Sequence, residues 1–285
     1  MIRKAVIPAA GLGTRLLPAT KEQPKEMLPI FSRGANGQLS VKPLLQLVFE
    51  QLYDVGIRDF CFIVGRGKRA IEDHFTPDMS YVEKLRDSGK NEKKDDLAMF
   101  YKKIERSTVY WINQPDPKGF GDAVLRAKSF AGKDDFLVHA GDTFIVTEGQ
   151  WHLKKCISQK VGGADDAILV VRRVEDPKRF GVIRSKSSGK GEYKVLEAVE
   201  KPRKFISNLA LMPIYAFGSS IFRALKNVKE GVGGEIQLTD GIQKLIKTGK
   251  VRAIELPKNA IWVDVGTPES YWEAQQLTYR MFKGS

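Results

Sequence analysis

The chain has 285 residues, of which 42% are hydrophobic and 28% are charged, and its formal net charge is +13. This length fits one large α/β domain or two small ones, and the composition excludes a chain that is disordered throughout. The basic excess favours anionic partners such as phosphorylated metabolites, although a solvated basic surface explains the charge equally well.

Cysteine usage and apolar runs exclude further classes. Cys61 and Cys156 belong to no CxxC pair, so neither a disulfide framework nor a zinc site is indicated. Cys61 lies in an apolar run and is expected in the core. No apolar run approaches the roughly 20 residues of a membrane-spanning helix, and the N-terminus lacks a signal-peptide core. A cytoplasmic protein is therefore expected.

Short apolar runs alternate with amphipathic stretches in the first half of the chain. This alternation predicts βαβ units and a mainly parallel sheet. The charged stretch 86–96 is poor in apolar residues and is expected as an exposed, mobile loop. Strands are expected at 4–8, 60–64, 109–112 and 136–140, and helices at 43–55, 68–75 and 122–130.

The second half is richer in strands. No internal repeat and no Pro/Gly/Ser-rich linker interrupts it, so a single domain with a parallel half and a mixed half is expected. Strands are expected at 167–174, 181–185, 193–200, 209–217, 251–255 and 261–263, and helices at 220–228, 238–248 and 268–279.

A glycine loop, AAGLGTRL at residues 9–16, follows the first strand directly. Glycines at such a place let backbone N–H groups approach a phosphate. The loop fits neither the Walker motif nor the dinucleotide fingerprint, whose third glycine would fall at Leu16. Arg15 and Lys25 would offset the charge of a triphosphate. A tight turn with two surface cations is the simpler alternative.

The segment AGLGTRLLPATKEQPKEMLPIF closely resembles the N-terminal signature of the bacterial and archaeal UTP–glucose-1-phosphate uridylyltransferases, which belong to the sugar nucleotidyltransferases. The resemblance spans nearly the whole chain. It implies an α/β, Rossmann-like fold of the glycosyltransferase-A type, with a mainly parallel sheet, flanking helices and an additional mixed sheet region. It also implies Mg²⁺ as cofactor, and UTP and glucose 1-phosphate as substrates. A thymidylyltransferase, or another sugar-1-phosphate nucleotidyltransferase with different preferences, is the alternative.

The resemblance assigns the nucleotide to two segments. Ala10, Gly11 and Gly13 of the glycine loop would contact it. In QPDPKG, Gln114 and the backbone of Gly119 would bind the uracil edge, since an amide both donates and accepts. Without the family match, QPDPKG would be interpreted as a turn.

Asp142 and Asp264 each end a probable strand, where open α/β sheets place their ligands. Mg²⁺ commonly takes one or two carboxylates together with phosphate oxygens. The two aspartates match the family's GD and WxDxGTP positions, which implies that they hold the metal. Each of them taken alone would more often belong to a turn or a helix cap.

Three further segments carry family motifs for the sugar phosphate. Gly181 in FGV would contact the sugar through its backbone. In VEKP, Glu200 would accept hydrogen bonds from sugar hydroxyls and Lys201 would pair with the phosphate. Glu235 in GEIQLTD is a weaker candidate for the sugar site. An exposed Glu–Lys pair at a strand end is the alternative for VEKP.

The implied reaction is an in-line attack of the sugar phosphate oxygen on the α-phosphorus of UTP, with pyrophosphate leaving. Arg15 and Lys25 would stabilise the departing pyrophosphate, and Lys201 would hold the attacking phosphate. No protein nucleophile is needed, because the attacking oxygen is already ionised. The histidines are therefore expected to be structural, and they are His74, His139 and His152.

The implied organisation is a single nucleotidyltransferase domain. Its nucleotide-binding half would cover 1–145, its sugar-phosphate-binding half 146–266, and a C-terminal helix 267–285. A polar segment at 32–40 departs from the family pattern and is expected as a surface loop or hairpin. This departure leaves a different sugar preference open.

Other partners and classes are less consistent with the sequence. A nucleic-acid binder would interleave basic residues with exposed aromatics, whereas most aromatics here fall in apolar runs. A dehydrogenase would need the dinucleotide fingerprint. No nucleic-acid or membrane partner is expected. A homo-oligomer is expected, although the aromatic C-terminal helix fits packing on its own domain equally well.

Overall fold

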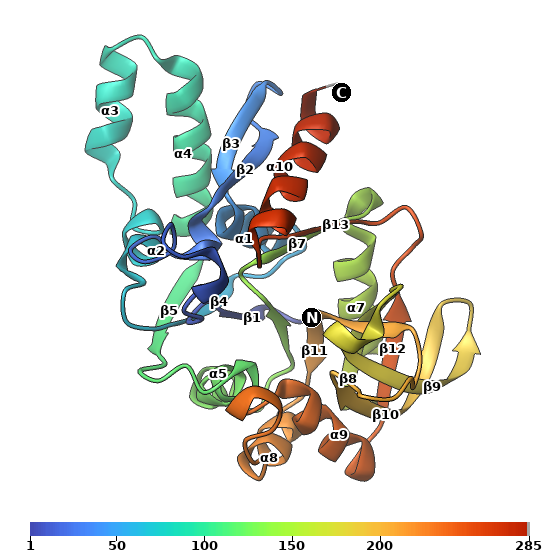
Figure 1. Cartoon of the computed structure of the whole chain (residues 1–285). Helices are drawn as coiled ribbons and strands as arrows, with labels where there is room; N and C mark the ends of the chain where they lie inside the picture. Colours follow the sequence, from blue (N-terminus) through green and yellow to red (C-terminus); the bar gives the residue numbers. More distant parts are fainter. Residues whose placement is uncertain (284–285) are drawn as a thin grey trace.

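The computed structural model describes residues 1–283, and its centre is a nine-stranded sheet (Figure 1). In spatial order the strands are β5 (Thr108–Asn113), β4 (Asp59–Val64), β1 (Lys4–Pro8), β6 (Phe136–His139), β11 (Leu209–Phe217), β8 (Ala167–Arg173), β12 (Val251–Glu255), β10 (Glu192–Glu200) and β9 (Gly181–Gly189).

The sheet is mixed, so the mainly parallel sheet expected from the sequence is not confirmed. Strands β5, β4, β1 and β6 are parallel to one another, as are β8 and β12. Strand β11 runs antiparallel between β6 and β8, and β10 is antiparallel to both of its neighbours. The apolar runs of β8 and β11 predict buried strands but carry no information on direction, because both faces of the sheet are covered here.

Two short antiparallel pairs lie outside this sheet. Strand β7 (Thr143–Val146) pairs with β13 (Ile261–Asp264), and β2 (Pro29–Arg33) pairs with β3 (Leu39–Pro43). The polar segment 32–40 forms the end of the β2–β3 hairpin, so the expected hairpin is confirmed. Strand β7 was not predicted; it has only four residues and begins directly after Asp142.

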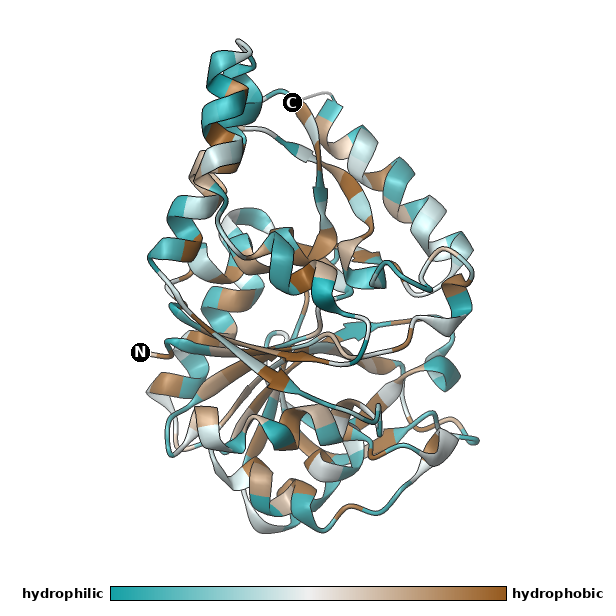
Figure 2. Ribbon diagram, turned by 90° about the vertical axis from the view of Figure 1, so that its left-hand side faces the viewer, coloured by the Kyte–Doolittle hydropathy of each residue, from teal (hydrophilic) through white to brown (hydrophobic). Residues whose placement is uncertain are grey.

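Helices cover both faces of the sheet (Figure 1). The protein has two hydrophobic clusters, and strand β1 contributes to both. Ala5 and Ile7 belong to one cluster, and Val6 belongs to the other. Figure 2 shows apolar strands at the centre of the molecule and polar residues on the outer helices. The helices are α1 (Leu44–Asp54), α2 (Arg69–His74), α3 (Met79–Asp87), α4 (Asn91–Glu105), α5 (Phe120–Arg126), α6 (Lys128–Ala131), α7 (Trp151–Gly162), α8 (Ser220–Lys226), α9 (Leu238–Thr248) and α10 (Pro268–Lys283).

The prediction of a mobile loop at 86–96 is wrong. Helix α3 ends within this stretch and α4 begins within it, and the two form a helical pair that projects from the sheet (Figure 1). Val82, Phe100 and Ile104 bury an apolar stripe, while the charged residues occupy the exposed sides. The high charge density therefore reflects a solvated helix surface rather than a loop.

Several other expectations are settled by burial and helix boundaries. Helix 122–130 is divided into α5 and α6, and α7 was not predicted.

Cys61 is fully buried as expected, and burial raises the pKa of its thiol to about 12. Along residues 1–283, no helix combines the length and the apolar character needed to cross a membrane. The central sheet draws strands from both predicted halves, and the division into halves stays a prediction.

Candidate active site

A cavity of about 340 Å³, here called the first cavity, opens beside the carboxyl ends of β1 and β6. Its walls come from the glycine loop, the turn at Lys25, the QPDPKG segment and the start of α5. The lining residues are Pro8, Ala10, Gly11, Leu12, Gly13, Thr14, Lys25, Glu26, Gln114, Pro117, Gly119, Phe120, Ala123, Asp142 and Glu235.

The glycine loop has a conformation that depends on Gly13. This residue has a φ of +67°, and its carbonyl oxygen accepts a hydrogen bond from the Thr20 hydroxyl at 2.8 Å. A Cβ atom at position 13 would lie 3.1 Å from the Thr20 Cβ atom. Glycine therefore lets the loop close tightly against Thr20, and it leaves Gly11 beside the Lys25 side chain.

Lys25 and Asp142 form an ion pair on the wall of the first cavity. The Lys25 ammonium donates to Asp142 Oδ2 at 2.5 Å, and both side chains are mostly buried. Burial alone would raise the pKa of Asp142, but the Lys25 charge and hydrogen bond hold it below the usual value. The Asp142 charge in turn raises the pKa of Lys25. Both groups therefore stay charged at neutral pH.

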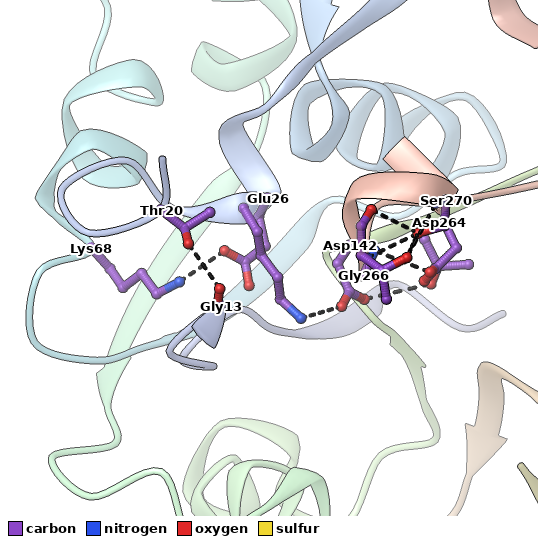
Figure 3. Close-up of polar contacts among 11 residues, drawn as sticks. Gly13, Thr20, Glu26, Lys68, Asp142, Asp264, Gly266 and Ser270 are labelled. Carbon is purple, nitrogen blue, oxygen red and sulfur yellow. Dashed lines mark hydrogen bonds and ion pairs between the residues drawn. The ribbon is translucent and has the colours of Figure 1, made fainter. Parts of the chain in front are cut away.

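Asp264 lies beside Asp142 because strands β7 and β13 pair in register. Asp264 is opposite Thr143 in this pair, and the Val265 N–H donates to the Asp142 carbonyl oxygen at 3.3 Å. Figure 3 shows the Asp142 and Asp264 side chains next to each other. Burial raises the pKa of the Asp264 carboxyl, and the nearby Asp142 charge adds to the rise. The Gly266 N–H donates to Asp264 Oδ2 at 3.0 Å. The two predicted metal ligands are thus brought together.

The chemistry of this pair suits a hard divalent cation. Two carboxylates repel each other in a buried place, and that repulsion is relieved when a cation binds between them. Among residues 1–283 no group of three or more His, Cys, Asp or Glu side chains could hold a metal ion. Such a cation would take its other ligands from substrate phosphate oxygens and water, as Mg²⁺ commonly does.

Arg15 lies apart from the first cavity's lining. It is exposed on the short 3₁₀ helix Thr14–Leu16. Burial raises the pKa of Asp142, and Lys25 is the main group that lowers it; the Arg15 charge adds a smaller lowering effect. A Cβ atom on Gly266 would come within 3.2 Å of Arg15 Nη2, so the guanidinium lies next to the segment that follows Asp264.

A second cavity, of about 270 Å³, adjoins the first. The two share Phe120 and Asp142, so the Asp142 side chain stands where they meet. The lining residues of the second cavity are Phe120, Ala140, Asp142, Thr143, Arg179, Phe180, Gly181, Glu200, Leu211, Met212, Pro213, Tyr215, Gln237, Leu238, Thr239, Trp262 and Asp264.

Glu200 is fixed in the second cavity by a hydrogen bond from Thr239, whose hydroxyl donates to Glu200 Oε2 at 2.6 Å. Burial raises the pKa of the Glu200 carboxyl. Lys201 is exposed, has a φ of +42°, and lies outside the lining of this cavity as the described residues define it. Arg179, which no sequence pattern set apart, supplies a cation to the lining instead.

The GEIQLTD segment contacts both cavities. Glu235, a candidate for the sugar site, lines the first cavity, whereas Gln237 and Thr239 line the second. The Gly121 N–H donates to the Ile236 carbonyl at 2.8 Å, which joins this segment to the start of α5. The sequence of this segment indicates the start of a helix. Its position between the two cavities depends on contacts with residues far away in the chain, such as Gly121.

The histidines lie away from the chemistry. Within the described part of the chain, neither cavity has a histidine in its lining. Burial lowers the pKa of His74 and His139 to about 4 and that of His152 to about 3. They are therefore neutral over the physiological pH range.

The nucleotidyl transferase family matches residues 4–280 of the chain. The chain belongs to this family. A UTP–glucose-1-phosphate uridylyltransferase of Bacillus subtilis is 39% identical over 258 residues, which cover 89% of this chain and 84% of the relative. The resemblance inferred from the glycine loop is therefore confirmed.

Solved structures place this nucleotidyl transferase in the same fold, an α/β fold with a mixed sheet. A UDP-glucose pyrophosphorylase complexed with UDP-glucose aligns with a TM-score of 0.83 at 30% identity, covering 99% of this chain and 100% of that one. A UTP-bound UGPase from Acinetobacter baumannii aligns with a TM-score of 0.83 at 31% identity, covering 97% of this chain and 93% of that one.

A buried ion pair supports the turn that carries Lys25. Lys68 donates to Glu26 Oε2 at 2.9 Å, and the two side chains are only 6% and 2% exposed. Burial raises the pKa of Glu26, and the Lys68 charge opposes that rise. In the Lys68→Met variant Glu26 loses this partner, so we expect the free energy of unfolding to fall by about 3 kcal/mol.

Urea denaturation measures this loss. The matched control is Lys103→Met, which breaks a more exposed ion pair with Asp54 and should cost less than about 1 kcal/mol. Equal losses in the two variants would show that the Glu26–Lys68 pair has no special structural role.

Gly181 offers a second test, because it leaves no room for a side chain. A Cβ atom there would lie 2.7 Å from Thr239 Oγ1 and 2.8 Å from Glu200 Oε2. Gly181→Ala should displace the Glu200 carboxylate and raise the KM for the sugar phosphate about tenfold or more, with a smaller effect on the KM for the nucleotide. Steady-state kinetics with each substrate varied in turn measure both values.

Gly189→Ala is the control on the same strand, since a Cβ atom there has no neighbour closer than 3.8 Å. It should leave both KM values unchanged. A Gly181→Ala enzyme with a normal KM for the sugar phosphate would place the sugar elsewhere.

Proposed function

We propose that this chain transfers the uridylyl group of UTP to glucose 1-phosphate, giving UDP-glucose and pyrophosphate. The observation that carries the proposal is the meeting of two cavities at Asp142. One is bordered by a glycine loop and a cation, as a triphosphate requires, and the other contains a buried carboxylate suited to sugar hydroxyls. The name of the Bacillus subtilis relative and the UDP-glucose and UTP bound in the two solved structures support the same reaction.

The first cavity would hold UTP. Backbone N–H groups of Gly11 and Gly13 would face the phosphates, and Gln114 would meet the base. Lys25 would neutralise charge that develops on the bond between the α- and β-phosphates as it breaks. Arg15, beside Gly266, would approach the departing pyrophosphate from the open side of the loop.

The second cavity would hold glucose 1-phosphate. Glu200, oriented by Thr239, would accept hydrogen bonds from sugar hydroxyls, and Gly181 would let the ring come close to the strand. Arg179, which lines this cavity, would hold the phosphate with an oxygen directed at the α-phosphorus of UTP. Lys201 is exposed outside the lining, and its side chain would have to turn inward to share this role. The new bond to phosphorus forms as the bond to the bridging oxygen breaks, so pyrophosphate is released without a covalent enzyme intermediate.

Asp142 and Asp264 are the residues that we propose hold Mg²⁺. Bound there, the ion would orient the nucleotide phosphates and neutralise part of their charge. The Lys25 ammonium now paired with Asp142 would be freed to contact the phosphates.

Pyrophosphate release across a panel of nucleotides and sugar phosphates, with and without Mg²⁺, tests the proposal. UTP with glucose 1-phosphate should give the highest kcat/KM, and chelation of the metal should stop release. Higher kcat/KM with dTTP would indicate a thymidylyltransferase. Absence of release with every pair would contradict nucleotidyl transfer by this chain.

A further inference from the structure

The side chain of Gln114 is held in a fixed orientation by its neighbours. Gln114 follows β5, is only 3% exposed, and lines the first cavity. Its Nε2 atom donates to Asp122 Oδ2 at 2.7 Å and to the Gly119 carbonyl oxygen at 3.3 Å. Both partners are acceptors only, so the amide nitrogen, and not the amide oxygen, must face them.

The amide oxygen of Gln114 is therefore the atom available to a ligand. Among residues 1–283, no group donates a hydrogen bond to Oε1 in this structure, while Nε2 has two partners. Turning the amide over would give up the Asp122 contact and would place Oε1 against a carboxylate. Because that carboxylate is only 12% exposed, water would compensate little of the repulsion.

Asp122 is itself held in place. It lies in the first turn of α5, and the Arg126 guanidinium one turn later donates to the same Oδ2 atom at 2.9 Å. Asp122 and Arg126 both belong to α5, and the first residues of this helix form one wall of the first cavity. Asp122 does not line the cavity as the described residues define it, so it can act on a ligand only through Gln114.

We infer that Asp122 is a positioning residue that makes Gln114 an obligate hydrogen-bond acceptor and thereby selects uracil over cytosine. The inference rests on the proposed function, with UTP in the first cavity. The uracil ring carries an N–H at position 3, which an oxygen can accept. Cytosine has a lone pair at that position, which would face the Gln114 oxygen without a hydrogen bond. Thymine shares the uracil N–H, so this device would not separate UTP from dTTP.

The substitution Asp122→Asn tests the inference. The introduced amide would have nearly the same shape as the carboxylate but no charge, and it could donate as well as accept, so the penalty for turning the Gln114 amide over would fall. The ratio of kcat/KM for UTP to that for CTP should fall about tenfold or more, mainly through KM, while the ratio of UTP to dTTP should not change. Asp122→Ser, which also removes the carboxylate, is measured alongside in case the first variant folds poorly.

Two controls separate this role from a structural one. Arg126→Gln breaks the same ion pair but leaves the carboxylate beside Gln114, so it should retain the preference for UTP. Asp165→Asn breaks the ion pair between Asp165 and Arg252, whose side chains are 10% and 31% exposed. These values almost equal the 12% and 30% of Asp122 and Arg126, and the pair is far from Gln114 in sequence. This substitution should cost similar thermal stability without changing the ratio.

The outcomes distinguish a failure of this inference from a failure of the proposed uridylyl transfer. A wild-type chain that prefers UTP, with an unchanged ratio in the folded Asp122 variants, overturns the inference alone. The same drop in ratio in Arg126→Gln or Asp165→Asn also overturns it, because the effect would then follow from lost stability. A wild-type chain with no preference for UTP over CTP overturns both the inference and the proposed uridylyl transfer.

Discussion

Asp142→Asn and Asp264→Asn should each lower kcat for pyrophosphate release by about three orders of magnitude or more while the protein stays folded. Asp142 stands where the two cavities meet, and strand pairing places Asp264 beside it. Asparagine retains the shape of the side chain but removes the charge that attracts a cation. The losses should appear in kcat more than in KM, since the cation acts on charge that develops during the reaction.

Asp240→Asn is a suitable control for these two variants. Asp240 is also a partly buried carboxylate, and burial raises its pKa, but it lines neither cavity as described. Its substitution should leave kcat within about twofold of wild type. Circular dichroism and thermal melting would check the fold of all three variants. Near-normal kcat in Asp142→Asn or in Asp264→Asn would remove that residue from the active site.

Lys25→Met should lower kcat by about two to three orders of magnitude. The Lys25 ammonium borders the first cavity beside Gly11 and pairs with Asp142 at 2.5 Å. Methionine has similar bulk but no charge, so the variant would lose the cation that we propose neutralises the leaving pyrophosphate. Single-turnover measurement of UDP-glucose formation separates this effect from slow product release.

Lys21→Met provides the matched control for Lys25. Lys21 lies in the same segment, but its side chain is 77% exposed, and within residues 1–283 it forms an ion pair only with Glu22, its neighbour in sequence. Loss of this charge should change kcat less than about twofold. If both variants lost activity to the same degree, a general loss of positive charge around the loop, rather than a specific contact, would account for the result.

Local sequence predicts most of the first cavity. The strand at 4–8 and the glycine loop after it are recognisable from the residues alone. The backbone turns at Gly13 with a positive φ, a conformation that glycine adopts without strain. Asp142 follows a buried strand and Asp264 ends another, so the edge of a sheet was a sound expectation for both. Their actual proximity depends on the β7–β13 pair, which joins residues more than a hundred positions apart and has no local signal.

The second cavity is harder to predict because distant segments build it. Arg179 lines it, yet this residue does not stand out in its own stretch of sequence. Strand direction was the other limit. Strand β11 passes between β6 and β8 in the opposite direction, and its apolar residues would satisfy either orientation. Similarly, the charges at 86–96 are consistent with a loop. The helix there is stabilised by buried residues outside this stretch, such as Phe100, which the charge pattern does not reveal.

The account depends most on a cation held between Asp142 and Asp264 where the two cavities join. Electron paramagnetic resonance of Mn²⁺, a spectroscopic substitute for Mg²⁺, measures its binding directly in the presence of UTP. Binding to the wild-type chain should weaken about tenfold or more in Asp142→Asn and in Asp264→Asn, and should not change in Asp240→Asn. Unchanged Mn²⁺ affinity in both active-site variants would contradict the account.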